Sequence, residues 1–334
     1  MKTPLLNICL LGLSLLTVTP ALAGIDQRQP IRGLIDELVQ QHRFDRQYLQ
    51  QLFARVELKP GVIERITRPA EALPWHRYRN IFVKEKRIRQ GVEFWNAHAD
   101  TLARAEREFG VPAEIIVAIL GVETRYGRHR GGFRVMDSLT TLALDYPRRS
   151  KFFTRELKEF LLLARQEGFD PLAIVGSYAG AMGKPQFIAS SYHRYAIDFD
   201  GDGVRDLLDN TADAIGSVAN YLKRHGWRSG QAVATPAFVQ GEAYKAWVKQ
   251  GIKPRLTLAE GRRYGVRWEG DLSLQAKAAL IELEQPDGFE YWLGLDNFYV
   301  ITRYNHSQLY AMAVYQLAQA IRQLREQQNL QARR

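Results

Sequence analysis

The stretch "VPAEIIVAILGVETRYG", residues 111–127, predicts a compact helix with one acidic side chain on an apolar face. A proline near its beginning and a glycine at its end are typical of the first turn and of the stop of a helix. The positions i, i+3, i+4 and i+7 of one face are occupied by Ile116, Ile119, Leu120 and Glu123. Glu123 therefore stands where the pattern requires an apolar residue.

Glu123 is a candidate catalytic acid because two effects are expected to raise the pKa of its carboxyl group. Burial disfavours the charged form, and the C-terminal end of a helix disfavours an anion. A carboxylic acid that stays protonated near neutral pH can protonate a leaving glycosidic oxygen. The helix taken alone favours a plainer interpretation, a structural glutamate paired with Arg125, Arg128 or Arg149.

A second stretch, "GSYAGAMGKPQF" at residues 176–187, combines glycine and alanine with the polar residues Ser177 and Gln186. Small residues let the backbone approach a ligand or another helix closely. The small residues alone fit tight helix packing, whereas the polar ones suit ligand binding.

Three motifs in this order, "ETRYG", "SYAGAMGxxQF" and "YNHSxxY", resemble the membrane-bound lytic transglycosylase B family of cell-wall enzymes. The resemblance extends over residues 75–315, and the motifs are specific in combination. The departures lie in "KPQFIASS", where Lys184, Ile188 and Ala189 replace commoner choices.

The resemblance implies a goose-lysozyme-like helical core that cleaves the MurNAc–GlcNAc bond of peptidoglycan without water and leaves 1,6-anhydroMurNAc ends. It implies that Glu123 is the only catalytic acid. The substrate-binding residues that it implies are Tyr78, Ser177, Gln186, Tyr221, Tyr304, Asn305 and Tyr310. Tyrosine suits this task because its ring packs on a sugar face while its hydroxyl bonds to the sugar.

A single acid has a consequence for the mechanism, because ordinary glycosidases use two carboxylates. The motifs show no second acid, and the contexts of Asp137 and Asp145 resemble turn and cap positions. The resemblance implies that the substrate's acetamido oxygen and C6 hydroxyl replace the missing group. Two alternatives remain: a hydrolytic muramidase, and a non-catalytic glycan-binding protein, against which the presence of Glu123 argues.

The stretch "DFDGDGVRDLLD", residues 198–209, predicts an EF-hand-like calcium loop, with aspartates at positions 1, 3 and 5 and glycine at position 6. The expected ligands are Asp198, Asp200, Asp202, the carbonyl group of Val204, and either Asp209 or Asp213. We expect calcium to stabilise the fold rather than to take part in catalysis. The alternative is a solvated turn rich in aspartate.

The first 23 residues predict a signal peptide, with Lys2, a short apolar stretch and "ALA" before the expected cleavage site. Cys9, the single cysteine, lies inside it, so we expect neither a disulfide nor a stable lipid anchor. The net charge of +10 favours anionic partners, and export argues against nucleic acid. We therefore expect a soluble periplasmic protein whose partner is the glycan strand of peptidoglycan.

The predicted fold class is mainly α (α+β): a goose-lysozyme-like core with additional helices, the calcium loop and a small inserted β module. The last two features rest on the aspartate loop and on β-branched and aromatic runs such as "AALIELEQ", which "QPDG" separates from the next run. The predicted domains are a signal peptide (1–23), an N-terminal helical region (24–105), a catalytic core (106–230) with the calcium loop (198–213), a β module (231–304) and a C-terminal helix (305–334).

Overall fold

The computed structural model describes residues 24–67 and 73–332 of the 334-residue chain. The predicted signal peptide lies outside the described residues. Most of the described elements are helices and one small sheet is present, so the predicted mainly α fold is confirmed. None of the helices in this part of the chain is long and apolar enough to cross a bilayer.

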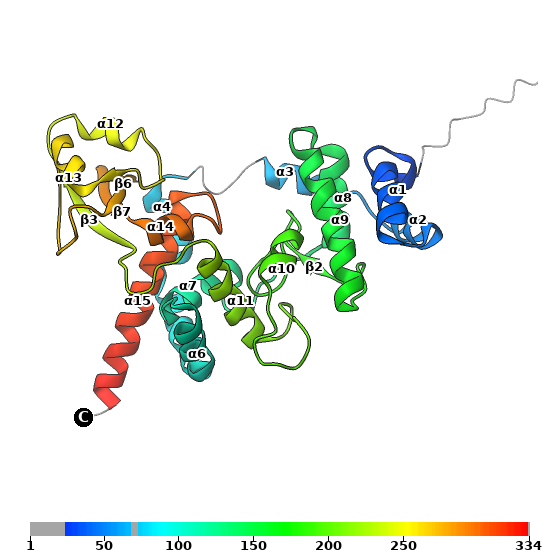
Figure 1. The fold of residues 1–334 in the computed structure, drawn as a ribbon, viewed down its shortest axis with the longest axis horizontal. Helices are drawn as coiled ribbons and strands as arrows, with labels where there is room; N and C mark the ends of the chain where they lie inside the picture. Colours follow the sequence, from blue (N-terminus) through cyan, green and yellow to red (C-terminus); the bar gives the residue numbers. More distant parts are fainter. Residues whose placement is uncertain (1–23, 68–72, 333–334) are drawn as a thin grey trace, which may run out of the picture.

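One lobe, on the right of Figure 1, combines the N-terminal helices with a helix pair from the middle of the chain. Its elements are η1 (Ile25–Gln27), α1 (Ile31–His42), α2 (Arg46–Ala54), α3 (Pro60–Ile66), α8 (Val135–Asp145), η3 (Pro147–Arg149) and α9 (Ser150–Glu167). Helix α8 is buried along most of its length because α9, α3 and α1 all pack against it.

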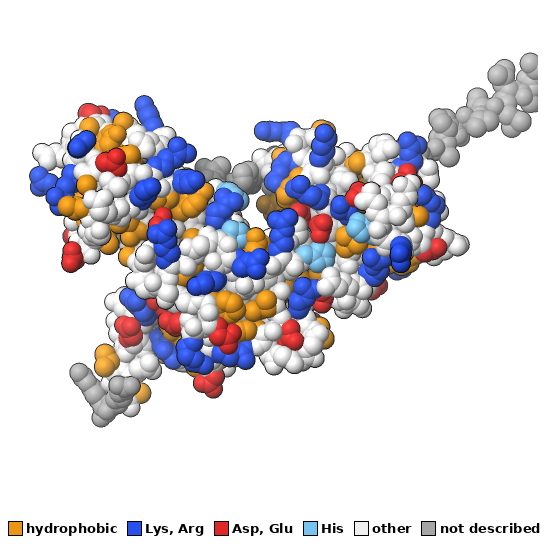
Figure 2. Space-filling model, in the orientation of Figure 1, with side chains coloured by type: hydrophobic (Ala, Val, Ile, Leu, Met, Phe, Trp, Pro, Cys, Tyr) orange, Lys and Arg blue, Asp and Glu red, His pale blue; other side chains and the backbone are white. Residues whose placement is uncertain are grey.

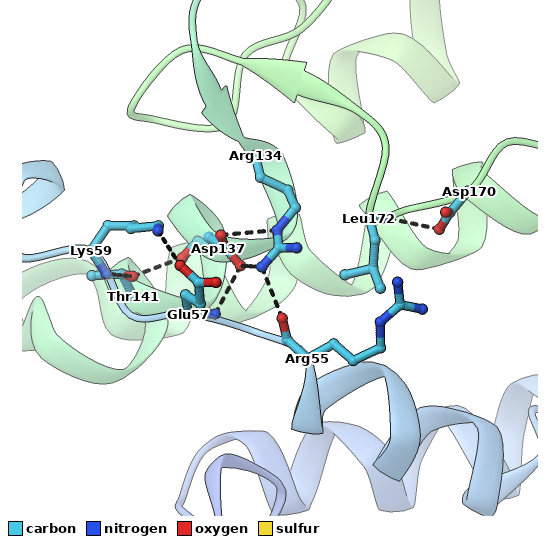
Figure 3. Close-up of polar contacts among 8 residues, drawn as sticks. All are labelled: Arg55, Glu57, Lys59, Arg134, Asp137, Thr141, Asp170 and Leu172. Carbon is cyan, nitrogen blue, oxygen red and sulfur yellow. Dashed lines mark hydrogen bonds and ion pairs between the residues drawn. The ribbon is translucent and has the colours of Figure 1, made fainter.

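A polar cluster fixes the segment between α2 and α3 onto α8 (Figure 3). The buried carboxylate of Asp137 accepts from the Arg134 guanidinium at 2.8 and 2.9 Å and from the Glu57 backbone N–H at 3.0 Å. Arg134 also donates to the Arg55 carbonyl oxygen at 2.8 Å. The backbone N–H of Lys59 donates to Thr141 Oγ1 at 2.9 Å. Asp137 is therefore a structural carboxylate that accepts from Arg134 and from the Glu57 backbone.

The other lobe is built around α7. Its helices are α4 (Trp75–Phe82), α5 (Glu85–Ala97), α6 (Ala99–Phe109), α7 (Ala113–Thr124), α11 (Thr211–Arg224), α14 (Asp296–Ile301) and α15 (Gln308–Ala332). Helix α7 packs against α15, α5, α11 and α6, and Figure 1 shows the long α15 running beside it.

Short elements connect the two lobes. Strand β1 (Phe133–Arg134) pairs antiparallel with β2 (Val175–Gly176), and α10 (Ala189–Tyr195) packs on both α9 and α11. The loop from residue 176 to residue 188 lies between β2 and α10, so it sits where the lobes meet.

The β module contains one antiparallel sheet in the order β4-β6-β7-β3-β5. Its elements are β3 (Ala234–Val239), α12 (Tyr244–Val248), β4 (Leu256–Thr257), α13 (Leu258–Gly261), η4 (Arg262–Tyr264), β5 (Val266–Trp268), β6 (Lys277–Gln285) and β7 (Gly288–Gly294). The register pairs Gln285 with Gly288, so "QPDG" closes a hairpin as expected. The module has a small core of its own around Trp247, Leu258 and Leu293, while the predicted domain boundaries stay predictions.

Two segments differ from the interpretation of the sequence. The stretch at residues 64–83 is rich in proline and aromatic residues, and its sequence alone indicates a loop or a cleft wall, but α4 begins directly after Pro74, whose fixed φ suits a helix start. The run at residues 290–304 was expected to be strand throughout, but only its first part is β7 and Asp296–Ile301 form α14. Helix α14 forms because Phe298 and Ile301 are fully buried in the main core, which overrides their β propensity.

The surface carries its positive charge in a dispersed form. Figure 2 shows lysine and arginine side chains across both lobes and the β module, with acidic side chains between them. This distribution agrees with the net charge of +10 and with a preference for anionic polymers rather than for one small anion.

Candidate active site

Helix α7 lies in the core of its lobe and carries Glu123 near its C-terminal end. Every residue of α7 is buried except Glu123, which is half-buried. The predicted apolar stripe is therefore one face of a helix that is apolar on all sides. A carboxyl group at the end of such a helix is held in a fixed place by the packing of the whole lobe.

The chain reverses immediately after Glu123 through three consecutive left-handed residues. The φ angles are 52° for Arg125, 62° for Tyr126 and 84° for Gly127. Left-handed backbone is unfavourable for the two non-glycine residues, so the surrounding structure must hold them there. Tyr126 does so because its ring lies over Gly121 and its hydroxyl donates to the Arg87 carbonyl oxygen at 2.8 Å.

Tyr310 contacts the carboxyl group of Glu123. Its hydroxyl donates to Glu123 Oε1 at 2.6 Å, and the two residues come from α15 and α7. Burial, and next the negative charge of Glu123, raise the pKa of Tyr310 well above its usual value. The phenol therefore stays protonated and remains a hydrogen-bond donor to the carboxylate.

The three arginines that could have made Glu123 a structural glutamate have other partners. Arg125 Nε donates to Gln90 Oε1 at 2.8 Å, and Arg128 lies 4.0 Å from a carboxylate oxygen of Glu93. The guanidinium of Arg149 stacks on the ring of Phe152 at 4.0 Å from the centroid. Each of these three arginines therefore has a contact with a residue other than Glu123.

Aromatic rings extend from Glu123 along the junction of the lobes. The rings of Tyr310 and Tyr304 are nearly parallel, at 8°, with centroids 6.3 Å apart, and Tyr304 lies 4.8 Å from Tyr221. The hydroxyl of Tyr304 donates to the Pro185 carbonyl oxygen at 2.6 Å, and that of Tyr221 to the Arg303 carbonyl oxygen at 2.5 Å. These bonds fix the rings, so their faces rather than their hydroxyls are the parts most suited to a sugar.

The loop at residues 176–188 carries the two predicted polar ligands, and Gln186 lines the same cavity as Tyr221 and Tyr304. Gln186 has a left-handed φ of 52°, and its Nε2 donates to the carbonyl oxygens of Arg130 at 3.1 Å and Gly183 at 3.0 Å. Its amide oxygen is then the atom suited to accept from a substrate. Ser177 Oγ accepts from the backbone N–H of Ala181 at 3.0 Å, which leaves its hydroxyl proton for another acceptor.

The remaining predicted ligands differ in exposure. Tyr78 is 1 % exposed and lies between the rings of Trp75 and Phe82 on α4. Asn305 is half-buried and directly follows Tyr304, and its carbonyl oxygen accepts from the Ser307 N–H at 2.7 Å. Contacts join Glu123, Tyr310, Tyr304 and Tyr221 in one group, and the sugar-binding roles of all seven residues stay predictions.

A cavity of about 340 Å³ opens beside Gln186, Tyr221 and Tyr304. Its other lining residues include Arg149, Arg194, Arg303, His225 and His306. None of the described residues that line it carries a carboxylate, and Glu123 itself is not among them. Two larger cavities, of about 690 and 760 Å³, involve residues 228–296 and contain none of the predicted site residues.

The predicted calcium loop places three carboxylates together. One carboxylate oxygen from each of Asp198, Asp200 and Asp202 lies within 4.8 Å of the other two. Asp198 accepts from the backbone N–H groups of Gly203 at 2.8 Å and Gly201 at 2.7 Å, and these bonds hold the pKa of its carboxyl group below the usual value. Three ionised oxygens at this spacing repel one another and match the oxygen ligands that calcium prefers, so the residues present fit this ion.

The two candidates for closing the loop lie outside the group of three. Asp213 is fully buried and accepts at 2.7 Å from the backbone N–H groups of Phe199 and Asp206, which ties both ends of the loop together. Asp209 pairs with Arg130 at 2.7 Å. The backbone N–H of Val204, whose carbonyl was the predicted ligand, donates to Asp202 at 2.8 Å.

Comparison with known proteins assigns this arrangement to a family. Residues 26–319 match the family described as "Transglycosylase SLT domain". The chain belongs to this family. The match extends over both lobes and the β module, and the predicted family is thereby confirmed.

The transglycosylase-family chain is 45 % identical over 297 residues to membrane-bound lytic murein transglycosylase B from Escherichia coli K12, covering 86 % of this chain and 81 % of the relative. The structure of soluble lytic transglycosylase SltB1 from Pseudomonas aeruginosa matches with a TM-score of 0.83 and 50 % identity, covering 88 % of this chain and 98 % of that one.

Two further structures of this family contain ligands. A lytic transglycosylase from Escherichia coli in complex with calcium matches with a TM-score of 0.81 and 45 % identity, covering 88 % and 93 % of the two chains. SltB3 from Pseudomonas aeruginosa in complex with NAG-anhNAM-pentapeptide matches with a TM-score of 0.74 and 33 % identity, covering 87 % and 78 %. The expectation of a family enzyme that cleaves peptidoglycan glycan is confirmed.

The sequence did not single out every residue that builds this site. Thr124 donates through Oγ1 to the Lys184 carbonyl oxygen at 2.7 Å and so joins the end of α7 to the loop that carries Gln186. The signal for Thr124 was its place in "ETRYG", directly after Glu123. Arg130 carried no signal at all, because its contact with Gln186 bridges 56 positions of the chain.

Proposed function

We propose that this protein is a lytic transglycosylase that cleaves the MurNAc–GlcNAc bond of peptidoglycan, with Glu123 as its single acid and base. The observation that carries the proposal is the half-buried carboxyl group of Glu123 at the end of a buried helix, with the Tyr310 hydroxyl 2.6 Å from Oε1.

In the first step Glu123 donates its proton to the glycosidic oxygen, and the bond from that oxygen to C1 of MurNAc breaks. The 2-acetamido oxygen of the same sugar stabilises the positive charge at C1. In the second step the C6 hydroxyl attacks C1 and its proton passes to the Glu123 carboxylate. The products are a 1,6-anhydroMurNAc end and a free GlcNAc hydroxyl, so no water is consumed and Glu123 is protonated again.

The other residues would hold the substrate for these steps. Tyr310 donates to Glu123 and would orient its carboxyl group. The same hydrogen bond would stabilise the carboxylate of Glu123 between the two steps. Gln186, Ser177 and Asn305 would bind the acetamido and hydroxyl groups. Tyr304, with the ring of Tyr221 beside it, would support a sugar ring, and Tyr78 would contribute to the same cleft.

Support for the anhydro product comes from the family. The SltB3 structure that holds NAG-anhNAM-pentapeptide contains an anhydro sugar of the kind that this mechanism forms. Three acids of this chain that could have activated a water are engaged elsewhere. Asp137 is paired with Arg134, Asp145 lies 3.2 Å from Arg28, and Glu156 accepts from the Ser190 hydroxyl at 2.8 Å.

The product separates this proposal from a hydrolytic muramidase. We expect strands digested by the purified protein to end in 1,6-anhydroMurNAc, lighter by one water than hydrolysed ends, because an intramolecular hydroxyl reaches C1 more readily than an unactivated water. Mass spectrometry with and without borohydride reduction measures this, since anhydro ends are not reduced. A muramidase treated in parallel is the control. Mainly reducible new ends would refute the proposal, and binding without cleavage would indicate a glycan-binding protein.

We further propose that the group of Asp198, Asp200 and Asp202 binds calcium as a structural ion. The relative solved with calcium supports this, as does the spacing of the three carboxylates in this chain. An ion there would offset their mutual repulsion and fix the turn that leads into α11, which carries Tyr221. The same proposal includes two further ligands: the carbonyl oxygen of Val204, and a carboxylate oxygen of either Asp209 or Asp213.

Calcium is expected to raise the melting temperature of chelated protein and to leave turnover at 25 °C nearly unchanged. A ligand that binds only the folded state stabilises it by about 2.7 kcal/mol at a hundredfold excess over Kd. Asp200→Ala combined with Asp202→Ala should abolish the rise, measured by calorimetry. The exposed pair Glu269→Ala and Asp271→Ala is the matched control and should retain it. Loss of turnover on chelation without loss of stability would contradict a structural role.

The remaining parts of the proposal concern location and domains. A periplasmic location after removal of residues 1–23 would place the enzyme beside its substrate. The proposed domains of the mature chain are 24–105, 106–230 with the calcium loop at 198–213, 231–304 and 305–334. The separate small core of the β module supports the third of these.

A further inference from the structure

The segment that follows the three aspartates, residues 207–209, lies against two basic residues of the active-site loops. The backbone N–H of Lys184 donates to the Leu207 carbonyl oxygen at 2.8 Å, and Lys184 Nζ donates to the Asp209 carbonyl oxygen. The Arg130 guanidinium donates to the carbonyl oxygen of Leu208, which lies between Leu207 and Asp209. It also donates to the Asp209 carboxylate at 2.7 Å. Two basic residues therefore bind three consecutive carbonyl groups.

The same two residues present their own carbonyl oxygens to the candidate active site. The Lys184 carbonyl oxygen accepts from Thr124 Oγ1 at 2.7 Å, and the Arg130 carbonyl oxygen accepts from Gln186 Nε2 at 3.1 Å. Thr124 is buried, directly follows Glu123, and its Oγ1 also accepts from the Gly127 N–H at 2.9 Å. Lys184 is thus hydrogen-bonded to Thr124, the residue that is covalently joined to Glu123.

The packing around Lys184 leaves little room for it to move alone. A Cβ atom at Gly127 would lie 3.1–3.3 Å from the methylene carbons of Lys184. A Cβ atom at Gly183 would lie 2.5 Å from the Leu207 carbonyl oxygen. The Lys184 stem is therefore in contact with the turn after α7, and its backbone with residues 207–209, so a shift of either displaces the other.

We propose that Lys184 is a positioning residue that, together with Arg130, couples the conformation of residues 207–209 to Glu123 and Gln186. The proposal rests on the proposed function of Glu123 as the acid.

Lys184→Met tests the proposal, because methionine keeps the length and the apolar stem but loses the ammonium group. We expect kcat on soluble glycan strands with peptide stems to fall about tenfold, with little change in melting temperature, and Lys184→Arg to restore most of it. The matched control is Lys223→Met, which removes an exposed lysine from α11 and should behave like wild type. A kcat for Lys184→Met equal to that of wild type would overturn the proposal, as would a loss fully explained by unfolding.

A second measurement separates coupling from a merely structural role. In a double-mutant cycle, Lys184→Met and Thr124→Val should lose kcat non-additively. Lys184→Met removes the Nζ bond to the Asp209 carbonyl oxygen, and Thr124→Val removes the Oγ1 bond to the Lys184 carbonyl oxygen, so each breaks one of two successive bonds in the connection to Glu123. Additive losses would contradict the proposal. Amide hydrogen exchange should also speed up at residues 124–130 in Lys184→Met but not in Lys223→Met. Exchange needs no turnover, so a wild type without transglycosylase activity would refute the proposed function alone, whereas unchanged exchange would refute the coupling.

Discussion

Glu123→Gln is expected to lower turnover on isolated peptidoglycan by roughly a thousandfold, which is the usual range for loss of a general acid. Glutamine keeps the shape and can still accept the hydrogen bond from Tyr310, so the fold and sugar binding should persist. It has no acidic proton for the glycosidic oxygen and cannot take one from the C6 hydroxyl, so both steps lose their proton carrier. Release of soluble fragments measures turnover, and binding to the sacculi measures affinity.

Glu114→Gln is the matched control, because Glu114 lies at the other end of the same helix. Glu114 is buried, and its Oε1 lies 3.4 Å from the guanidinium of Arg322. We expect its activity to stay within about twofold of wild type, as is usual for a substitution distant from the reacting atoms. Near-normal turnover of the Glu123 variant, or an equal loss in both variants, would remove Glu123 from the centre of the mechanism.

Gly131→Ala is expected to destabilise the protein by about 3 kcal/mol or more and to abolish activity under assay conditions. Gly131 has a φ of +100°, and a Cβ atom there would lie 2.0 Å from the Gly176 carbonyl oxygen and 2.8 Å from the Ser177 nitrogen. Both obstacles are backbone atoms, so they can yield only if the β1–β2 pair separates. That separation would move Ser177 and the Arg130 carbonyl group that holds Gln186.

The adjacent glycine provides the control for this prediction. A Cβ atom at Gly132 would have no heavy atom within 4 Å, and its φ lies outside the left-handed region. Gly132→Ala should therefore leave the free energy of unfolding within about 0.5 kcal/mol of wild type. Urea unfolding of the two variants measures the difference. Equal stabilities would show that the β1–β2 contact is not rigid.

The helix that carries Glu123 could be predicted from the sequence because its signals are local. Periodicity, a proline at the start and a glycine after the end all lie within residues 111–127. The acid on an apolar face was visible for the same reason. The hairpin of β6 and β7 was predicted from "QPDG" between two runs rich in β-branched and aromatic residues, and the paired register agrees.

Helix α14 shows where local signals fail. Its residues have strand propensity, yet Phe298 and Ile301 are fully buried in the main core. The amide of Asn297, also fully buried, donates to the carbonyl oxygens of Arg228 at 2.8 Å and Gln231 at 2.9 Å. These partners lie more than sixty positions away, so no window of the sequence contains the interactions that decide the conformation.

The sequence by itself singled out Glu123 as the candidate acid, the group of aspartates and the family motifs, since each signal lies in residues close together in the chain. Only the tertiary structure decided what surrounds the acid. The bond from Tyr310 to Glu123 spans 187 positions and the contact between Arg130 and Asp209 spans 79. Such pairs are set by how the lobes pack, and packing is a property of the whole core rather than of any segment.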